Sequence, residues 1–423
     1  MKISRILRRQ ISIMSMVLVS AAILLSTTGC TVRVKADDLM HNVKPNSVVG
    51  KTQDEPFIKA AAGFSVNLFG RSLDEDDNAL VSPLSVLLAL SMTANGAKGE
   101  TLTQMQDVLG GISINDLNKY LYAYVKALPN EKKAALHIAN SIWFRNDSSL
   151  QVNPDFLQAN ADYFQADAFR SPFNNQTAKD INNWVKQHTN GMIDEIVDEI
   201  RSDNMMFLIN ALAFEAEWAA IYEKKDVREG VFTEADGEKE TVKFMHSSEG
   251  QYLNDGKATG FIKPYANNTY SFVALLPYEN VGIDQYIKSL TGEGFVKTLQ
   301  DATNSSVIAA MPKFSYDYSI EMKKVLQDMG MAKAFSDEEA DFSGIGQCSA
   351  GNLFINSVLH KTYIAVDERG TKAGAVTKVE INCSSAGPGN TKTVILDRPF
   401  VYAIVDNATK LPLFMGTVRE IED

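Results

Sequence analysis

No group of reactive side chains in this chain has the spacing of a familiar catalytic or metal site. The segment closest to a nucleophile elbow, residues 346–351, does not fit G-x-S-x-G, and HExxH, CxxC, GxGxxG and GxxxxGK[ST] do not occur. The histidines are scattered without metal-ligand spacing: His41, His137, His188, His246 and His360. The sequence therefore predicts a protein that is not an enzyme and that uses no metal and no cofactor.

The unusual stretch is residues 366–385, VDERGTKAGAVTKVEINCSS, whose side chains alternate. Small and apolar residues occupy every second position: Thr371, Ala373, Ala375, Thr377, Val379, Ile381 and Cys383. Mostly polar residues stand between them, which is the pattern of a strand with one buried face. However, Gly370 opens the stretch, and the turn-forming residues 384–393 close it like an exposed loop. The pattern alone permits either an ordinary edge strand before a long loop or a loop that can become a strand.

The N-terminus predicts export. Four basic residues precede the apolar residues 11–25, and Gly29 and Cys30 follow. A run of this length suits a signal peptide better than a membrane-spanning helix. Gly29 and Cys30 resemble a bacterial lipoprotein box, which would make Cys30 the site of lipid attachment; simple secretion is the alternative. We expect a signal peptide over 1–29, a polar tether over 30–54, and an extracytoplasmic protein that is membrane-anchored or secreted.

Charge and cysteine content narrow the partners. The formal net charge is −11, and it becomes −15 without the four basic residues of the signal peptide. An acidic chain without a dense Lys/Arg run argues against nucleic acid as a partner. Beyond Cys30 only Cys348 and Cys383 remain. We expect two free thiols, with a disulfide between them as the alternative.

The remaining residues predict one large domain over 55–423 with both helices and strands. Apolar periodicity predicts helices over 55–71, from Ser82 to Gly96, over 156–164, before Asn190, and near 282–301. Apolar runs predict strands over 137–144, 205–214, 306–312 and 353–366, a hairpin turning at Asn267 and Asn268, and a C-terminal hairpin over 396–418.

A series of motifs, in order over about residues 55–420, resembles the serpins, a superfamily of protease inhibitors. The matching residues are Asn78, Ser82, Pro83, Gly96 and Thr101; Ile181, Asn182, Trp184 and Gly191; Asn210, Ala211, Phe214 and Trp218; Lys263, Pro264 and Tyr265; Lys313 and Phe314; 340–344; His360 and Lys361; 398–400; and 414–416. Glu215 and Ala216 depart from the Lys–Gly that is common in the family.

The resemblance implies an α+β serpin fold with about three mixed or antiparallel sheets, eight or nine helices and an exposed reactive-centre loop. It also implies a mechanism: a protease cuts the loop, and the freed loop enters the main sheet as an extra strand. The implied hinge residues are Glu368, Arg369, Gly370, Thr371, Ala373, Ala375 and Thr377. The usual spacing places the cut between Ser384 and Ser385, within the wider range 382–387.

Residue types in the stretch favour an inhibitor. Insertion would bury every second side chain, where bulk or charge is costly, and the series that starts at Thr371 carries neither. A serine or cysteine before the cut suits elastase-like or subtilisin-like serine proteases, and a cysteine protease is a second possible target. We expect a monomer. The alternative functions are a non-inhibitory serpin-fold lipoprotein that binds a surface partner, and a hydrolase or solute receptor.

Overall fold

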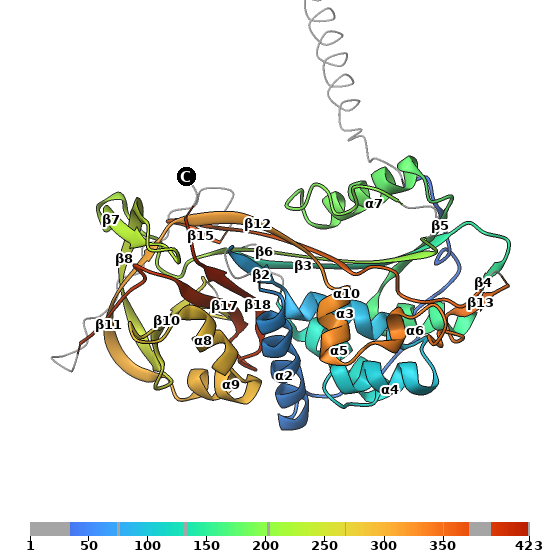
Figure 1. Ribbon diagram of the computed structural model, residues 1–423, viewed down its shortest axis with the longest axis horizontal. Helices are drawn as coiled ribbons and strands as arrows, with labels where there is room; N and C mark the ends of the chain where they lie inside the picture. Colours follow the sequence, from blue (N-terminus) through green and yellow to red (C-terminus); the bar gives the residue numbers. More distant parts are fainter. Residues whose placement is uncertain are drawn as a thin grey trace, which may run out of the picture. The chain divides into compact units, whose positions relative to one another are not determined.

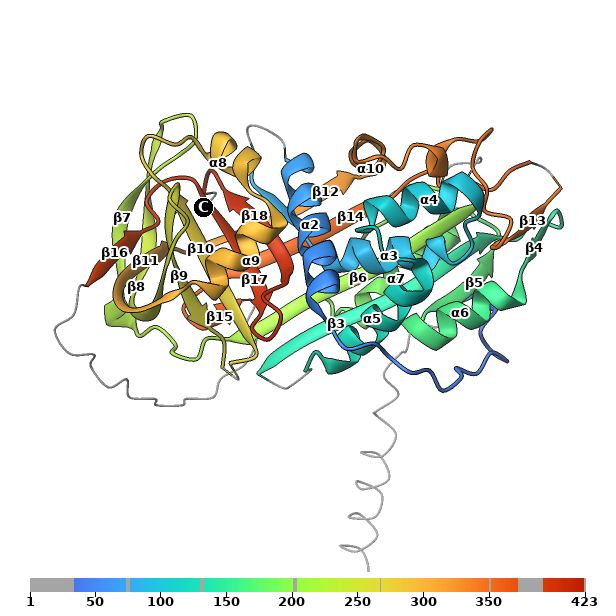
Figure 2. The same ribbon diagram turned by 90° about the horizontal axis from the view of Figure 1, so that it is seen from below.

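The computed structural model describes residues 34–73, 77–129, 133–200, 204–266, 268–349, 351–371 and 391–421. The chain divides into residues up to Lys35 and a second unit, Ala36–Asp423, which holds all the elements discussed below. Figures 1 and 2 show this unit from two directions. Among the residues that are described, no helix is both long enough and apolar enough to cross a membrane.

The first large sheet, sheet A, has seven described strands. Their spatial order is β1 (Asp37–Asp38), β5 (Asp167–Ser171), β3 (Ala134–Arg145), β6 (Met206–Glu217), β15 (Gly370–Thr371), β14 (Leu359–Val366) and β12 (Phe314–Glu321). Strands β3 and β6 pair antiparallel from Ala134 opposite Ala216 to Phe144 opposite Met206. The short β15 lies between β6 and β14 and pairs antiparallel with both.

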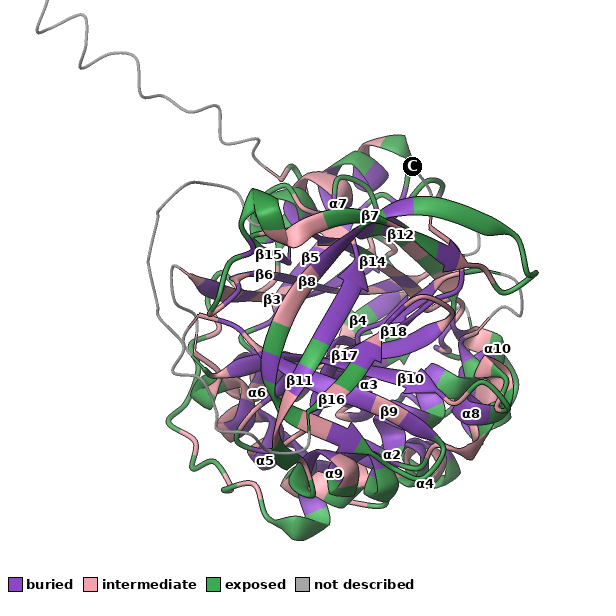
Figure 3. Cartoon of the chain, turned by 90° about the vertical axis from the view of Figure 1, so that its left-hand side faces the viewer, coloured by how far each residue is buried: buried purple, intermediate pink, exposed green. Residues whose placement is uncertain are grey.

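The second large sheet, sheet B, has nine strands among the described residues. Eight follow the order β16 (Lys392–Ile395), β11 (Thr303–Pro312), β8 (Lys239–Asn254), β9 (Ala258–Pro264), β10 (Tyr270–Pro277), β17 (Phe400–Asp406), β18 (Pro412–Val418) and β2 (Ala79–Val81), and β7 (Val227–Thr233) pairs with β8. Strands β17 and β18 are buried over their whole length, as Figure 3 shows. A separate two-stranded ribbon joins β4 (Leu150–Val152) to β13 (Gly346–Cys348).

The described part of the chain contains nine α-helices. They are α2 (Glu55–Arg71), α3 (Pro83–Ala94), α4 (Gly99–Val108), α5 (Ile114–Ala127), α6 (Pro154–Phe164), α7 (Asn175–His188), α8 (Ile283–Ser289), α9 (Gly292–Gln300) and α10 (Lys323–Met329), with 3-10 turns at Lys224–Asp226 and Lys333–Phe335. Several begin where local chemistry dictates. Asp54, Ser82 and Asn153 cap α2, α3 and α6, each followed by proline in the first helical turn.

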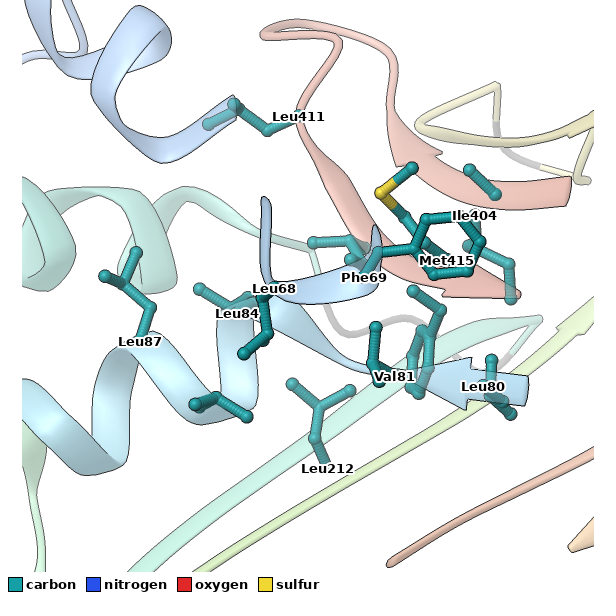
Figure 4. Packing of buried hydrophobic residues seen from close by; sticks show 14 of the residues in the cluster. Leu68, Phe69, Leu80, Val81, Leu84, Leu87, Leu212, Ile404, Leu411 and Met415 are labelled. Atoms are coloured by element: carbon teal, nitrogen blue, oxygen red, sulfur yellow. The ribbon is translucent and has the colours of Figure 1, made fainter. Parts of the chain in front are cut away.

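The layers place sheet A between helices. Helix α7 lies on one face, and α3 and α5 lie on the other (Figure 1). The core between sheet A, helix α3 and sheet B is apolar. Figure 4 shows Leu212 of β6 near Leu80, Val81 and Leu84, with Met415 of β18 close by. This packing fixes α3 directly beneath β6.

Three sequence predictions need correction. Residues 282–301 form two helices, because Thr291 caps a new helix by accepting from Gly294 N. Strand β14 begins only at Leu359, since Ile355 N donates to Ala334 O and holds the preceding segment away from sheet A. By contrast, the predicted hairpin turn between β9 and β10 is confirmed, and Asn268 in it has a φ of 56°.

The third correction concerns the tether predicted over 30–54. From Asp37 onward the chain lies on the domain: β1 pairs with β5, and Leu39 N donates to Ala168 O. Leu39, Met40 and Val43 pack against the core, which offsets the cost of ordering this segment. The structure therefore leaves only residues before Ala36 outside the folded unit.

Candidate functional site

The boundary between β6 and β14, called the seam below, is the place where the predicted hinge begins. Gly370 lies opposite Glu217 and Thr371 opposite Ala216 on β6, and Thr371 lies opposite Val366 on β14. Strand β3 pairs with the other edge of β6. Among the described residues, β15 is the only strand that pairs with the seam edge of β6. Two of the predicted hinge residues, Gly370 and Thr371, are thus part of sheet A.

Gly370 is required by the closeness of β6. A Cβ atom at this position would lie 1.9 Å from Ala216 O, far inside van der Waals contact. Any side chain here would push the hinge out of the seam.

Thr371 fills a buried polar site beneath the seam. Its side chain is 3% exposed, and its Oγ1 lies 2.6 Å from the Tyr265 hydroxyl. Burial raises the pKa of Tyr265, which therefore stays protonated. The Tyr265 ring stacks on Trp218 with 4.5 Å between centroids. The hydroxyl of Thr371 is thus paired inside an aromatic wall.

The turn over residues 367–369 contains the predicted hinge residues Glu368 and Arg369 and is held by residues 218–222, which we call the clasp. Trp218 Nε1 donates to Asp367 O at 2.9 Å, and Trp218 N donates to Arg369 O at 2.7 Å. Tyr222 N donates to Glu368 O at 3.0 Å. All three turn carbonyls therefore have a donor from the clasp.

An ion pair holds the same turn from the other side. Lys313, between β11 and β12, has its Nζ 2.9 Å from the carboxylate of Glu368. Burial raises the pKa of Glu368, but the hydrogen bond and charge of Lys313 outweigh it and leave the pKa below its ordinary value. Both side chains are one-third exposed, so water screens part of this attraction. Arg369, the next residue after Glu368, is exposed.

Polar side chains cross beneath the middle of the seam. Ser85 Oγ of α3 donates to Asn210 Oδ1 of β6, and Asn210 Nδ2 donates to Asn140 Oδ1 of β3. On the β14 side, His360 Nε2 accepts from Ser82 N at 3.0 Å. Burial lowers the pKa of His360 to about 4, so the imidazole is neutral at pH 7. Helix α3 therefore binds both strands that border the seam.

The remaining predicted site residues lie outside the described residues. These are the hinge residues Ala373, Ala375 and Thr377, the predicted scissile pair Ser384 and Ser385, the partner thiol Cys383, and Cys30. The chain is described again at Thr391 and enters sheet B as β16, parallel to β11. Residues 372–391 therefore connect sheet A to sheet B. Cys348 is a free thiol, 3.4 Å from Ser149 Oγ.

Sequence reasoning missed some residues of this site. Tyr222 carried no motif, nor did Glu249 of β8, which pairs with Lys263 of β9. Lys263 and Tyr265 were noted only as parts of a strand motif that resembles the serpins. A lysine in an otherwise apolar strand was the available signal, since lysine is almost never buried without a partner. Within the described ranges, no three His, Cys, Asp or Glu side chains converge as metal ligands.

The comparisons with known proteins agree with this geometry. The family model described as "Serpin (serine protease inhibitor)" matches residues 59–421. The chain belongs to the serpin family. The resemblance deduced from the motifs is thereby confirmed.

Three relatives place this serpin within the family. A serine protease inhibitor of Cyanea capillata is 30% identical over 81% of this chain and 92% of its own. The native state of tengpin, a thermophilic serpin, is 52% identical with a TM-score of 0.88, over 92% of this chain and all of that one. Human thyroxine-binding globulin complexed with thyroxine shares the fold, with 24% identity and a TM-score of 0.77, over 87% of this chain and 99% of that one. The predicted α+β serpin fold is confirmed.

Proposed function

We propose that this serpin is a suicide-substrate inhibitor of extracytoplasmic serine endopeptidases that prefer small residues before the cut. The family description names serpins as serine protease inhibitors. The observation that supports the proposal most directly is the position of Gly370–Thr371 in the seam. The hinge enters sheet A with its first residues already paired to both neighbouring strands.

Extending the register of β15 would continue the burial that begins at Thr371. In a strand, residues two apart share a face, so Ala373, Ala375 and Thr377 would follow Thr371 beneath the sheet. These side chains are small and uncharged. The intervening Lys372 and Lys378 would face the opposite side, where charge is tolerated. The chain is therefore suited to insertion.

The proposed reaction starts as ordinary proteolysis. The protease serine attacks the carbonyl carbon of Ser384, the amide nitrogen of Ser385 leaves with a proton, and an ester joins the enzyme to the new chain end. The freed segment from Thr371 to Ser384 then enters the seam and carries the acyl-enzyme along. Thirteen residue steps at about 3.3 Å give a strand of about 43 Å.

Incubation of the protein with pancreatic elastase, subtilisin, trypsin and papain tests this function. A denaturing gel should show a stable complex with the first two enzymes and none with trypsin, and the mass of the released C-terminal peptide identifies the cut bond. Complex with papain would extend the targets to cysteine proteases. Cleavage by every enzyme without complex would contradict inhibition and favour the non-inhibitory, surface-binding alternative.

The proposed location is the cell exterior, with Cys30 carrying the lipid. The basic start, the apolar residues 11–25 and the Gly29–Cys30 pair support it. Metabolic labelling with an alkyne fatty acid should mark the wild-type protein and leave Cys30→Ser unlabelled. Label on the Cys30→Ser variant would contradict attachment at this residue.

A further inference from the structure

A buried ion pair lies in sheet B beside the hinge. Lys263 Nζ of β9 is 3.0 Å from Glu249 Oε1 of β8, and the two side chains are 2% and 7% exposed. Placing two charges out of water is costly, and a buried pair is weak evidence for stability by itself. The pair therefore calls for a role other than simple stabilisation.

The pair belongs to a small polar network. Ser247 Oγ donates to the same Glu249 oxygen at 2.6 Å, and Lys263 Nζ reaches Ala220 O at 3.4 Å. The ammonium also lies 4.3 Å from the ring centroid of Tyr222 and 5.4 Å from that of Trp218. Burial lowers the pKa of Lys263, but Tyr222 and Glu249 outweigh it and keep the group charged.

Three of those contacts reach the clasp. Trp218, Ala220 and Tyr222 all belong to residues 218–222, which donate to the three carbonyls of turn 367–369. Ala219 N adds a hydrogen bond to Pro264 O of β9 at 3.0 Å. The clasp thus holds turn 367–369 with two backbone amides and the Trp218 indole. Its other side packs on β9, where Lys263 lies at the centre of the contact.

We propose that the pair of Lys263 and Glu249 is a positioning device for loop insertion. It fastens the clasp to sheet B, and the clasp holds turn 367–369 so that Thr371 stays in the seam before a protease arrives. When Thr371 is already paired in the seam, insertion of the cleaved loop should be faster. Faster insertion favours trapping of the protease over hydrolysis of the acyl-enzyme. This role rests on the proposed inhibitory function.

Two variants and one control test the proposal. Lys263→Met removes the ammonium, and Lys263→Met with Glu249→Gln removes both charges, so that no unpaired charge remains to prevent folding. Tyr286→Phe is the control. It deletes a partly buried hydrogen bond of 2.8 Å to Asp255, in the turn that joins β8 to β9.

The first readout is amide hydrogen exchange in the protein alone. Exchange in residues 218–222 and 367–371 should accelerate about tenfold in both Lys263 variants and stay at the wild-type rate in Tyr286→Phe. The second readout is the number of inhibitor molecules consumed per elastase molecule trapped. It should rise roughly threefold or more in the Lys263 variants alone, at an unchanged rate of initial cleavage.

The outcomes separate positioning from stability. A lower melting temperature without faster exchange at the hinge would overturn the proposal, because the pair would then act like any buried contact. Faster exchange with unchanged partitioning would also overturn it. If the wild type traps no protease, the inhibitory function fails, whereas the exchange experiment still decides whether Lys263 holds the clasp. If Lys263→Met does not fold, the double variant decides alone.

Discussion

At the scale of single residues, Thr371 shows most clearly how a buried environment requires one particular side chain, because its hydroxyl has a buried partner. It pairs with Tyr265 at 2.6 Å inside a site that excludes water. Leaving a buried hydroxyl without a partner costs more free energy than a hydrogen bond between two such groups contributes to stability. Alanine or valine at this position would also be small and uncharged. Each would nevertheless leave the Tyr265 hydroxyl without this partner.

Thr371→Val should therefore lower the free energy of unfolding by about 1–3 kcal/mol, because the buried Tyr265 hydroxyl loses its partner. Thr371→Ser keeps the hydroxyl and should lose less. Urea denaturation of the three proteins measures the effect. Equal stability of the Val variant and the wild type would show that the hydrogen bond contributes nothing.

His360 makes stability depend on pH. Its pKa is about 4 in the folded protein, against about 6.5 in an unfolded chain. The contribution is complete above pH 6.5, because the imidazole is then neutral in both states. It falls as the pH drops towards 4, because only the unfolded chain takes up the proton, and the loss is on the order of 3 kcal/mol.

His360→Gln should flatten this part of the pH profile, since glutamine does not titrate. Urea midpoints of both proteins between pH 7 and pH 4 measure the difference. Parallel profiles would mean that His360 is not the group responsible.

At the scale of elements, residues 37–54 before α2 lie across the surface of the domain, and we call this segment the strap. Asn46 N donates to Asp162 Oδ1, and Gln158 Nε2 donates to Lys44 O. Both partners belong to α6, while β1 pairs with β5. The strap therefore joins a helix and an edge strand of sheet A.

Two valines in the strap form a matched pair. Val43 packs against the core, whereas Val49 is 85% exposed. Val43→Ser should cost about 1 kcal/mol of unfolding free energy, and Val49→Ser should cost nothing measurable. Chemical denaturation compares them. An equal effect of the two substitutions would indicate that the strap does not pack as described.

A second matched pair tests which face of the hinge is buried on insertion. Ala373→Glu would place a carboxylate beneath the sheet, and Lys372→Glu would place one on the outer face. The first variant should become a substrate that is cleaved without trapping, and the second should still trap. Densitometry of complex and cleaved bands on a gel measures the ratio. Equal trapping by both would contradict the predicted alternation.

Much of this fold could be predicted because its local signals and its tertiary contacts agree. The Ser82–Pro83 start of α3 and the helix over Glu55–Arg71 appear where capping and periodicity place them. The strap was predicted as a tether since its composition is polar, and only three apolar side chains, Leu39, Met40 and Val43, attach it. Helix α5 was not predicted. Of the clasp, only Trp218 was named from the sequence, because two of the three hydrogen bonds to turn 367–369 come from backbone amides that carry no residue signature.

At the scale of the whole folded unit, sheet A is incomplete in the described structure at the seam. A strand from Thr371 towards Ser384 would add hydrogen bonds to β6 and to β14. At about 0.5–1.5 kcal/mol for each bond, the gain is on the order of 10 kcal/mol. Under the proposed insertion mechanism, the intact protein is therefore less stable than the cleaved protein.

Cleavage of the loop should accordingly raise the melting temperature. Calorimetry before and after a single cut by elastase measures the change, and protein cut within the tail that follows Val418 is the control. An unchanged melting temperature after cleavage between residues 382 and 387 would contradict insertion.

The register of sheet A also fixes which way the hinge faces relative to the strap. At the hinge, Thr371 pairs with Ala216 of β6, and Ala216 pairs in turn with Ala134 of β3. At the strap, β1 pairs with β5 at Phe169, and Phe169 pairs with Trp143 of β3. Nine residue steps along β3 separate the two places, about 30 Å. The chain from Cys30 to Ala36 spans at most about 22 Å. If Cys30 is lipidated, the domain is held close to the bilayer by the end of sheet A remote from the hinge. The hinge end of sheet A would then face away from the membrane, towards proteases in the surroundings, and the membrane would shield the opposite end.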